Sequence, residues 1–274
     1  CAGLGRRAGL TFDGNTMTFR SLLVCGMLAL AACKSGGGAS GPNLGPAPVD
    51  PELAKQKADS LWQVGLKQFR QGSFHSASET FQRVLLEFTP ADPRIPQAHF
   101  YLGESYFGSG SQLQAVREFR KVSDEYPSNP LAPDALYRAG DAYATLWKKP
   151  QLDPSYGQSA IATFTELLNR YPDSPAAAKG RTQLADLQAK LAYKEWENAR
   201  YYLRNKAFDS AILYMKALVA TYPNTPSAQQ ALVQLVKTYG ELGYLEDAAE
   251  MCGALRQYHP DTKNLDKICP AAGG

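Results

Sequence analysis

Residues 160–172 read AIATFTELLNRYP, and this stretch decides how the rest of the chain is interpreted. It starts on the small residue Ala160 and carries Phe164 and Leu167 four and seven positions later. Spacings of four and seven place side chains on one face of a helix. The stretch ends at Pro172, and proline disfavours the helical conformation of the residue before it. We therefore predict an amphipathic helix with a small contact residue at its start and a defined end.

The same pattern recurs at four other places in the chain. In three of them an alanine lies twelve residues before a proline, and these copies start at Ala115, Ala211 and Ala248. The remaining copy starts at Ala77, and its proline comes one residue late, at Pro90. Four residues after each alanine stands an apolar or sulfur-containing side chain, which is Phe81, Phe119, Phe164, Met215 or Cys252. Five copies of one helix predict a repeat protein.

Another helical segment precedes each of these helices. It has its own contact residue, which is Gly65, Gly103, Gly140, Ala199 or Val236. The sequence therefore predicts five helix pairs, over residues 52–90, 94–127, 131–172, 174–223 and 226–260. The first helix of the fourth pair should be unusually long, since no proline follows the Ser174-Pro175 start before Arg204. The pattern resembles the tetratricopeptide repeat, so we expect an all-α tetratricopeptide-repeat solenoid that winds as a right-handed superhelix.

The composition argues against several functional classes. The chain has 274 residues, and its 29 basic and 26 acidic side chains give a formal charge of +3, which is too small to indicate nucleic-acid binding. Its five cysteines and three histidines lack metal-ligand spacing, and the common nucleotide, metalloprotease and serine hydrolase motifs are absent. A peptidoglycan hydrolase would need two carboxylates in one cleft, whereas acidic residues are scattered here. We expect no catalytic residue, no cofactor and no metal site.

The amino-terminal segment has the features of a bacterial lipoprotein signal. After Met17 and a basic residue come twelve apolar or small residues, SLLVCGMLALAA, and then Cys33. Twelve residues are too few to span a bilayer, which takes about 20, but they fit a secretory signal. The stretch 30–33, LAAC, resembles a lipobox, which implies cleavage before Cys33 and lipid on its sulfur. A plain secretory signal with an incidental cysteine is the alternative.

These features divide the chain into five segments. They are an upstream extension at 1–16, a lipoprotein signal peptide at 17–32, a lipidated flexible tether at 33–50, the repeat domain at 51–260 and a tail at 261–274. The tether is rich in Gly, Ser and Pro, a composition that cannot bury a core. Lys34 follows the cysteine, and lipoproteins kept in the inner membrane often have Asp there, so we expect the periplasmic face of the outer membrane.

The first helices of such a solenoid line a concave groove. In the first three pairs the groove positions hold aromatic residues, which are Trp62, Phe69, Phe100, Phe107 and Tyr137. Such a stripe fits an extended peptide with aromatic side chains. Aromatic residues at helical spacing also form cores, so both interpretations stay open. In the fourth pair the corresponding positions include Trp196, Arg200 and Arg204, which predict a second, partly charged surface for a folded partner.

Two cysteines remain after signal cleavage and lipidation of Cys33, and these are Cys252 and Cys269. A disulfide between them is one interpretation, because disulfides persist in an oxidising periplasm. Cys252 also stands where the other repeats place a buried apolar side chain. A buried, unpaired thiol is therefore the alternative.

Taken together, the lipobox, the tether and the repeats resemble the BamD family of outer-membrane β-barrel assembly (BAM) lipoproteins. The most specific stretches are NRYPDSP at 169–175, ARYY at 199–202, FDSA at 208–211 and YPNT at 222–225. The resemblance implies a non-catalytic, lipid-anchored scaffold that promotes folding and insertion of outer-membrane proteins. The implied partners are the POTRA domains of BamA, other BAM lipoproteins and unfolded outer-membrane proteins.

One position departs from the family pattern. Members of the family carry an arginine near the BamA contact, and this chain has Tyr214 at the equivalent position. The role of that residue is therefore not transferred. A different periplasmic repeat protein, such as a Tol-Pal coordinating protein, is the alternative. That family has a coiled coil before its repeats and no lipid anchor, whereas this chain has a lipobox and no charged heptad run.

Overall fold

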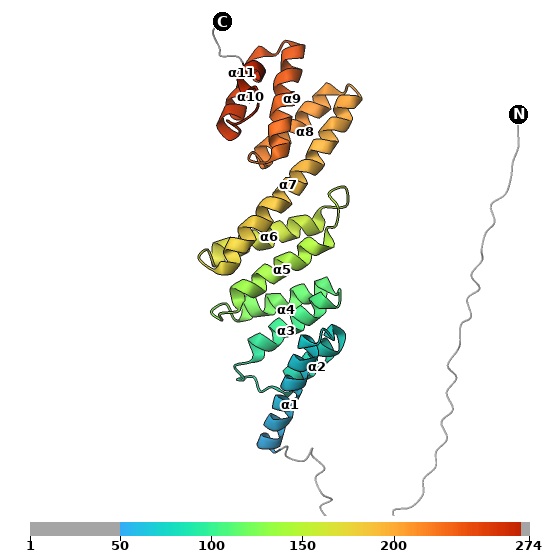
Figure 1. Cartoon of the computed structure of the whole chain (residues 1–274), viewed down its shortest axis with the longest axis vertical. Coiled ribbons are helices and arrows are strands. Elements are labelled where there is room, and N and C mark those ends of the chain that lie inside the picture. The colour runs from blue at the N-terminus through green and yellow to red at the C-terminus, as the bar shows by residue number, and fades with distance from the viewer. Residues whose placement is uncertain (1–49, 270–274) are drawn as a thin grey trace, which may run out of the picture. The chain divides into compact units, whose positions relative to one another are not determined.

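The computed structural model describes residues 50–269, and these residues form eleven α-helices and no β-strand (Figure 1). The helices are α1 (Pro51–Arg70), α2 (Phe74–Glu87), α3 (Ile95–Gly108), α4 (Gln112–Glu125), α5 (Ala132–Leu146), α6 (Ser155–Arg170), α7 (Pro175–Arg204), α8 (Phe208–Thr221), α9 (Pro226–Leu242), α10 (Leu245–Tyr258) and α11 (Leu265–Ile268). The upstream extension, the signal peptide, Cys33 and residues 270–274 lie outside the described residues.

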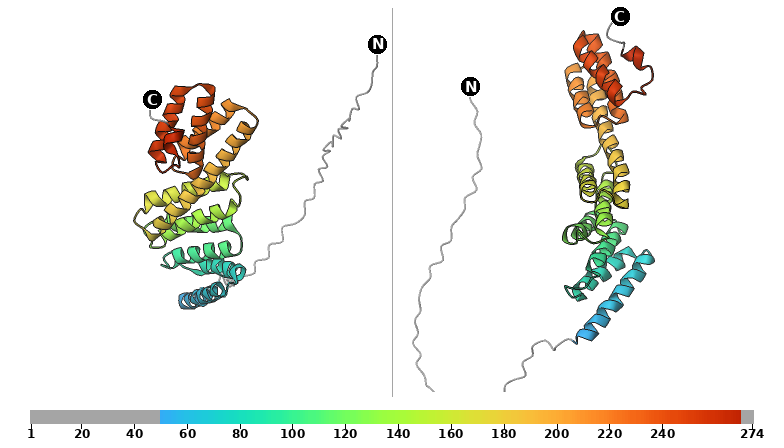
Figure 2. Two further views of the ribbon diagram at one scale, coloured as in Figure 1. Left: turned by 45° about the horizontal axis from the view of Figure 1, so that its top comes forward. Right: turned by 90° about the vertical axis from the view of Figure 1, so that its left-hand side faces the viewer.

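The first ten helices form five consecutive pairs. Each helix from α1 to α10 contacts the next one along the chain, so that every pair lies against the pair before it (Figures 1 and 2). The predicted all-α tetratricopeptide-repeat solenoid is thus confirmed. One element was not predicted, because α11 is a short helix within the tail and contacts α9.

Contacts within each pair follow the repeat pattern of the sequence. Ala115, Ala160 and Ala211 are fully buried, as predicted. In the first three pairs a glycine of the first helix faces a buried phenylalanine ring of the second, in the combinations Gly65 with Phe81, Gly103 with Phe119 and Gly140 with Phe164. A Cβ atom on any of these glycines would lie within 3 Å of the ring. The absence of a side chain therefore lets the two helices approach closely.

The long first helix of the fourth pair is also confirmed. α7 has 30 residues, and the hydroxyl of Ser174 caps it by accepting a hydrogen bond of 3.1 Å from the Ala177 amide. Its first half packs against α5 and α6, and its second half packs against α8 and α9 (Figure 2). Leu187 and Leu191 belong to the core around Trp147, whereas Ala199 belongs to the core of the last two pairs. α7 therefore joins two hydrophobic cores with one continuous helix.

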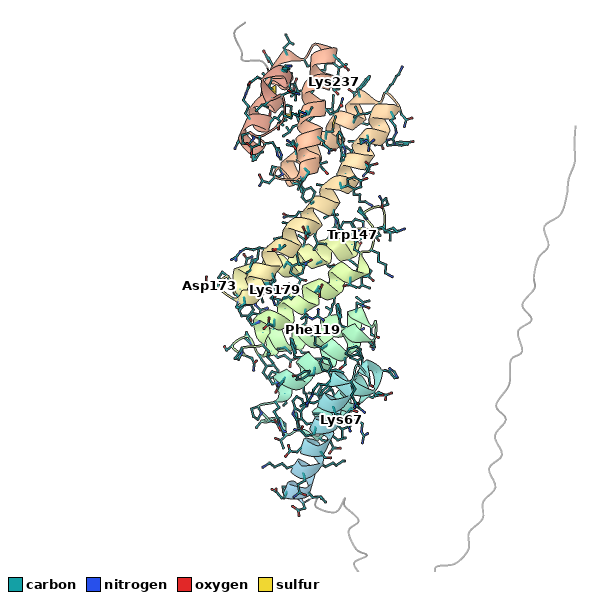
Figure 3. The ribbon with its side chains drawn as sticks, in the orientation of Figure 1. Lys67, Phe119, Trp147, Asp173, Lys179 and Lys237 are labelled. Atoms are coloured by element: carbon teal, nitrogen blue, oxygen red, sulfur yellow. A yellow bond between two sulfur atoms is a disulfide. The ribbon has the colours of Figure 1, made fainter. Side chains whose placement is uncertain are left out.

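Trp147 lies directly after α5, where the third pair has its longer connection (Figure 3). The ring is 1% exposed and lies against Gly157 of α6. Within residues 50–269 its indole nitrogen is buried and has no hydrogen-bond partner. The ammonium of Lys190 from α7 lies 5.7 Å from the ring and adds a cation–π contact.

Candidate interaction surfaces

Trp62, which we predicted to line a peptide groove, lies in the core instead. It is only 6% exposed. Its ring meets the ring of Phe81 at 5.6 Å and the ring of Tyr101 at 5.9 Å between centroids, both edge to face. α3 packs against α2 and carries Tyr101, so residues from two neighbouring helices enclose the indole. This burial favours the packing interpretation for Trp62 over contact with a ligand.

Phe69 and Phe100 are partly buried, and their rings also contact aromatic neighbours. Phe69 meets Phe74 at 5.7 Å and Tyr101 at 5.2 Å. Phe100 meets the fully buried ring of Phe119 at 5.6 Å. Edge-to-face contacts of this kind stabilise a core by more than the buried area alone. For these two residues the packing interpretation is favoured, although each keeps part of its ring exposed.

Phe107 and Tyr137 lie beside a charged cluster on the first helices. The guanidinium of Arg138 lies 4.1 Å from the centre of the Phe107 ring and bonds the Glu104 carboxylate at 2.9 Å. It also contacts Asp141 one turn along α5. Burial lowers the pKa of Arg138, but the hydrogen bonds with Glu104 and the negative charges of Glu104 and Asp141 together outweigh this effect, so that the pKa lies above its usual value. Arg138 thus stays charged and covers one face of Phe107.

Tyr137 contacts the core on one side and a lysine on the other. Its ring lies 5.7 Å from the ring of Phe164, and the ammonium of Lys179 lies 6.0 Å from its centre. Burial raises the pKa of the Tyr137 phenol, and the Asp141 carboxylate raises it further. Figure 3 shows Lys179 near the start of α7, on the side of the third pair. Tyr137 is therefore a partly exposed ring at the junction of α5, α6 and α7.

The second half of α7 presents a surface of exposed aromatic and basic side chains. Tyr193, Glu197, Arg200 and Arg204 follow one another at steps of four, three and four residues, which places them on one helix face. Tyr193 is 43% exposed, and Tyr201, which borders the same face, is 57% exposed. We refer to these five residues as the α7 surface. Its two tyrosines were missed by the sequence analysis, although their spacing from Arg200 and Arg204 could have indicated them.

The structure places the three residues predicted for partner binding in two different environments. Arg200 and Arg204 are exposed on the α7 surface. Arg200 bonds Glu197 of the same helix at 2.7 Å, whereas Arg204 has no ion pair within residues 50–269. Trp196 is turned toward the core of the last two pairs and packs there as a partly buried residue. It supports the helix rather than forming the centre of the exposed surface.

Tyr214 lies on α8 and is part of a tyrosine stack. Its ring lies 5.1 Å from the ring of Tyr202 with an angle of 16° between the planes, and Tyr201 meets Tyr202 edge to face. Next to it, Leu213 is 69% exposed. This arrangement extends the α7 surface onto α8 through aromatic contacts, at the position where the family pattern predicts an arginine.

Ionisable groups elsewhere in the chain pair with one another across helices. The imidazole Nδ1 of His99 lies 2.6 Å from the Glu118 carboxylate, and both side chains are 12% exposed. Burial raises the pKa of Glu118, but the hydrogen bonds and charge interactions with His99 and Lys121 together outweigh it, and the pKa lies below the usual range. Arg120 of α4 bonds Glu166 of α6 at 2.6 Å. The first contact joins the two helices of the second pair, and the second contact links the second pair to the third.

Between residues 50 and 269 no three His, Cys, Asp or Glu side chains converge closely enough to hold a metal ion. In the same range no helix has the length and apolar character needed to cross a bilayer.

A concave surface lies between α9 and α10 and was not predicted. It has a volume of about 970 Å³, and its lining residues are Val233, Val236, Lys237, Gly240, Glu241, Leu245, Ala248, Ala249, Cys252, Gly253, Arg256 and Ile268. Figure 3 marks its position with Lys237 on α9. We refer to it as the α9–α10 groove. The structure joins Cys252 to Cys269 by a disulfide bond, with 5.5 Å between the Cα atoms.

Comparisons with known proteins match most of this helical stack. The family model YfiO, described as an outer membrane lipoprotein, matches residues 54–254. The outer membrane protein assembly factor BamD of Caulobacter vibrioides is 24% identical over 205 residues, which are 75% of this chain and 67% of that protein. BamD of Xylella fastidiosa is 26% identical over 238 residues, which are 80% of this chain and 81% of that protein.

Among solved structures, the TPR2AB domain of yeast Sti1 in its pHSP90 complex is similar over 76% of this chain and 80% of that chain. The TM-score is 0.42 and the identity is 14%. The family model spans the structure from α1 into α10, and both relatives are outer membrane protein assembly factors. These findings do not favour the Tol-Pal alternative. The chain belongs to the BamD family, whose model is the YfiO outer membrane lipoprotein.

Proposed function

We propose that this chain is a non-catalytic scaffold that promotes folding and insertion of outer-membrane β-barrel proteins. The observation that carries the proposal is the family match over residues 54–254, since the relatives are outer membrane protein assembly factors. The chain accordingly has a role in outer membrane protein assembly. Its finer role is to hold a folded partner and an unfolded substrate on two separate parts of one helical stack.

A scaffold role agrees with the chemistry of the described side chains. Several half-buried ionisable groups pair with one another across helices, as in Arg138 with Glu104 and His99 with Glu118. Such pairs position helices, and their members are engaged with each other rather than free for general acid–base chemistry. The proposal therefore assigns no catalytic residue to the chain.

The α7 surface is the proposed site for a folded partner, which the family resemblance identifies with the POTRA domains of BamA and neighbouring BAM lipoproteins. Tyrosine and arginine are enriched among residues that dominate binding energy at interfaces. The α7 surface combines Tyr193 and Tyr201 with Arg200 and Arg204, all of them exposed. Arg204 has no acidic partner within the described chain, so its guanidinium is available to a carboxylate of another protein.

The first three pairs are the proposed site for unfolded substrate. With Trp62 excluded by burial, four partly exposed rings remain, which are Phe69, Phe100, Phe107 and Tyr137. Each ring packs on one side against the core or a cation and keeps part of its surface open. Rigid, half-exposed rings offer contact area at a low cost in side-chain entropy.

The proposed location is the periplasmic face of the outer membrane, with a lipid anchor on Cys33. Several acyl chains hold a protein on a bilayer far more firmly than one does. A Cys33→Ser variant should lose acylation and either remain uncleaved or become soluble. Mass spectrometry of the mature amino terminus tests this, and any mature terminus other than an acylated Cys33 would contradict the anchor.

The experiment that tests the partner surface is charge reversal on α7. The variant Arg200→Glu/Arg204→Glu should weaken binding to a purified POTRA fragment of BamA from the same organism by about tenfold or more, equivalent to ~1.4 kcal/mol. The matched control is Arg83→Glu/Arg117→Glu, which makes the same charge change at two exposed arginines of α2 and α4. Equal losses in the two variants would show that net charge, not the α7 surface, governs binding.

Salt dependence and substrate capture complete this test. Because exposed charges are screened at high salt, the difference between the two variants should shrink at ~1 M salt. Substrate capture should remain unchanged in both variants. Conversely, Phe69→Leu/Phe107→Leu should weaken crosslinking to an unfolded outer-membrane protein and leave POTRA binding intact. If the leucine variant lost both activities while its melting temperature was unchanged, the division into two sites would be wrong.

A further inference from the structure

The last helix of the described chain is held by a covalent bond. Cys269, directly after α11, bonds to Cys252 of α10 across 17 positions of sequence. Cys269 is 0% exposed and Cys252 is 7% exposed. Both cysteine side chains are therefore largely shielded from solvent.

The non-covalent contacts of α11 are few. The helix has four residues, and a helix of this length does not persist without tertiary support. Leu265 and Ile268 pack against the core of the last two pairs as partly buried residues. The guanidinium of Arg256 donates to the Cys269 carbonyl, and Gln229 bonds Thr262 at 2.9 Å. Without the disulfide these contacts alone would have to hold residues 260–269.

The position of α11 in the repeat stack determines which surface it covers. In each of the first four pairs the second helix is covered by the first helix of the next pair, as α2 is by α3 and α8 is by α9. α10 is the second helix of the last pair. Within the described range, the side of α10 that a next pair would cover carries the α9–α10 groove, and Ile268 of α11 and Cys252 form part of the wall of this groove. α11 and its disulfide therefore close one side of an apolar surface.

We propose that Cys252 and Cys269 are an oxidation site that works as a latch: the disulfide keeps α11 on the last repeat, and reduction releases residues 260–269 and opens the α9–α10 groove on that side. Formation of the bond removes two protons and two electrons from the two thiols. A thiol–disulfide oxidoreductase accepts them, since its own disulfide is reduced to two thiols through a mixed-disulfide intermediate. The latch is independent of the proposed partner and substrate sites.

Two exposed lysines make the latch measurable by limited proteolysis. Lys263 and Lys267 lie on either side of the start of α11 and are exposed. Trypsin cleaves such sites at a rate that follows the population of the opened segment. The full chain is digested after purification under oxidising conditions and, in parallel, in the presence of a phosphine reductant. All samples are then fully reduced, and cleavage after Lys263 and Lys267 is quantified by mass spectrometry.

We expect cleavage at these two sites to rise by about tenfold or more on reduction, because cleavage tracks local opening. Cleavage after Lys55, an exposed lysine of α1, is the internal control and should stay constant. The variant Cys252→Ala/Cys269→Ala should be cleaved as fast as the reduced chain, with or without reductant. Amide hydrogen exchange over residues 260–269 should accelerate in the same samples.

Three outcomes would overturn the latch. Equal cleavage of the oxidised and reduced chains after Lys263 and Lys267 would show that α11 stays in place without the disulfide. A parallel rise after Lys55 would show that the bond holds the whole fold rather than α11. Recovery of both cysteines as free thiols from cells with an intact oxidation pathway, by alkylation and mass spectrometry, would show that the bond is not made.

Discussion

The contact between Gly103 and Phe119 allows a quantitative test of the repeat packing. A Cβ atom on Gly103 would lie 2.7 Å from Cε1 and 2.8 Å from Cδ1 of Phe119, a ring that is 0% exposed and cannot swing away. Overpacking of this kind costs roughly 1–3 kcal/mol. Alanine in a helix interior is favoured over glycine by about 1 kcal/mol. Gly103→Ala should therefore lower the free energy of unfolding by about 0–2 kcal/mol.

The chain contains a matched control for this substitution. Gly253 is the ninth residue of the 14-residue helix α10, and Gly103 is the ninth residue of the 14-residue helix α3. A Cβ atom on Gly253 would have no neighbour within 4 Å. Gly253→Ala should therefore gain about 1 kcal/mol from helix propensity alone. In a domain of this size 1 kcal/mol corresponds to roughly 2–4 °C in melting temperature, so calorimetry can separate the two variants.

The fourth repeat suggests how the clash can be relieved. There the pair is Ala199 with Met215, an alanine facing a flexible side chain, and both are fully buried. The variant Gly103→Ala/Phe119→Met copies this combination into the second repeat. A double-mutant cycle should give a favourable coupling of about 0.5–3 kcal/mol, since the residues are in contact. If Gly103→Ala stabilised the chain as much as Gly253→Ala, or if the coupling were zero, the proposed packing would be refuted.

Three further predictions concern stability. The pKa of Glu118 is lowered in the folded chain, so its contribution to stability is present at neutral pH and is lost as the pH falls below about 4.5, the usual value. In Glu118→Gln the free energy of unfolding, measured with urea, should therefore fall less steeply as the pH is lowered. Ser174→Ala removes the N-cap of α7 and should cost about 1 kcal/mol, read from the midpoint of chemical unfolding; no change would mean that the cap is replaced by solvent. Ala160→Leu should cost roughly 1–3 kcal/mol because the site is fully buried, and an unchanged melting temperature would argue against the repeat register.

The repeat register could be predicted from the sequence because it depends on local spacing. The alanine, the large side chain four residues later and the closing proline act within one helix, so their order along the chain is enough to place Ala115, Ala160 and Ala211 at helix contacts. The length of α7 followed in the same way from the Ser174-Pro175 start and the lack of a later proline. The basic residues of the α7 surface could be identified because helix spacing determines which positions share a face.

The fate of each aromatic ring was decided only by the tertiary structure. Trp62 and Phe69 occupy equivalent faces of α1, yet the first is enclosed by Phe81 and Tyr101 and the second keeps part of its ring exposed. Burial depends on which side chains of α2 and α3 arrive from other parts of the chain, and helical periodicity contains no such information. Arg138 covers Phe107 for the same reason, because these two side chains come from different helix pairs and meet only in the folded stack.

At the end of the solenoid, too, the tertiary structure decided features that the sequence left open. The sequence alone left two interpretations of Cys252 and Cys269 open, a disulfide and a buried free thiol. It predicted neither α11 nor the α9–α10 groove. A four-residue helix has too little local signal to be recognised, and a groove exists only as the space between two helices. Local periodicity along the chain therefore determined the helices and their pairing, whereas the surfaces open to partners were determined by long-range packing, which brings distant residues together and decides what they cover.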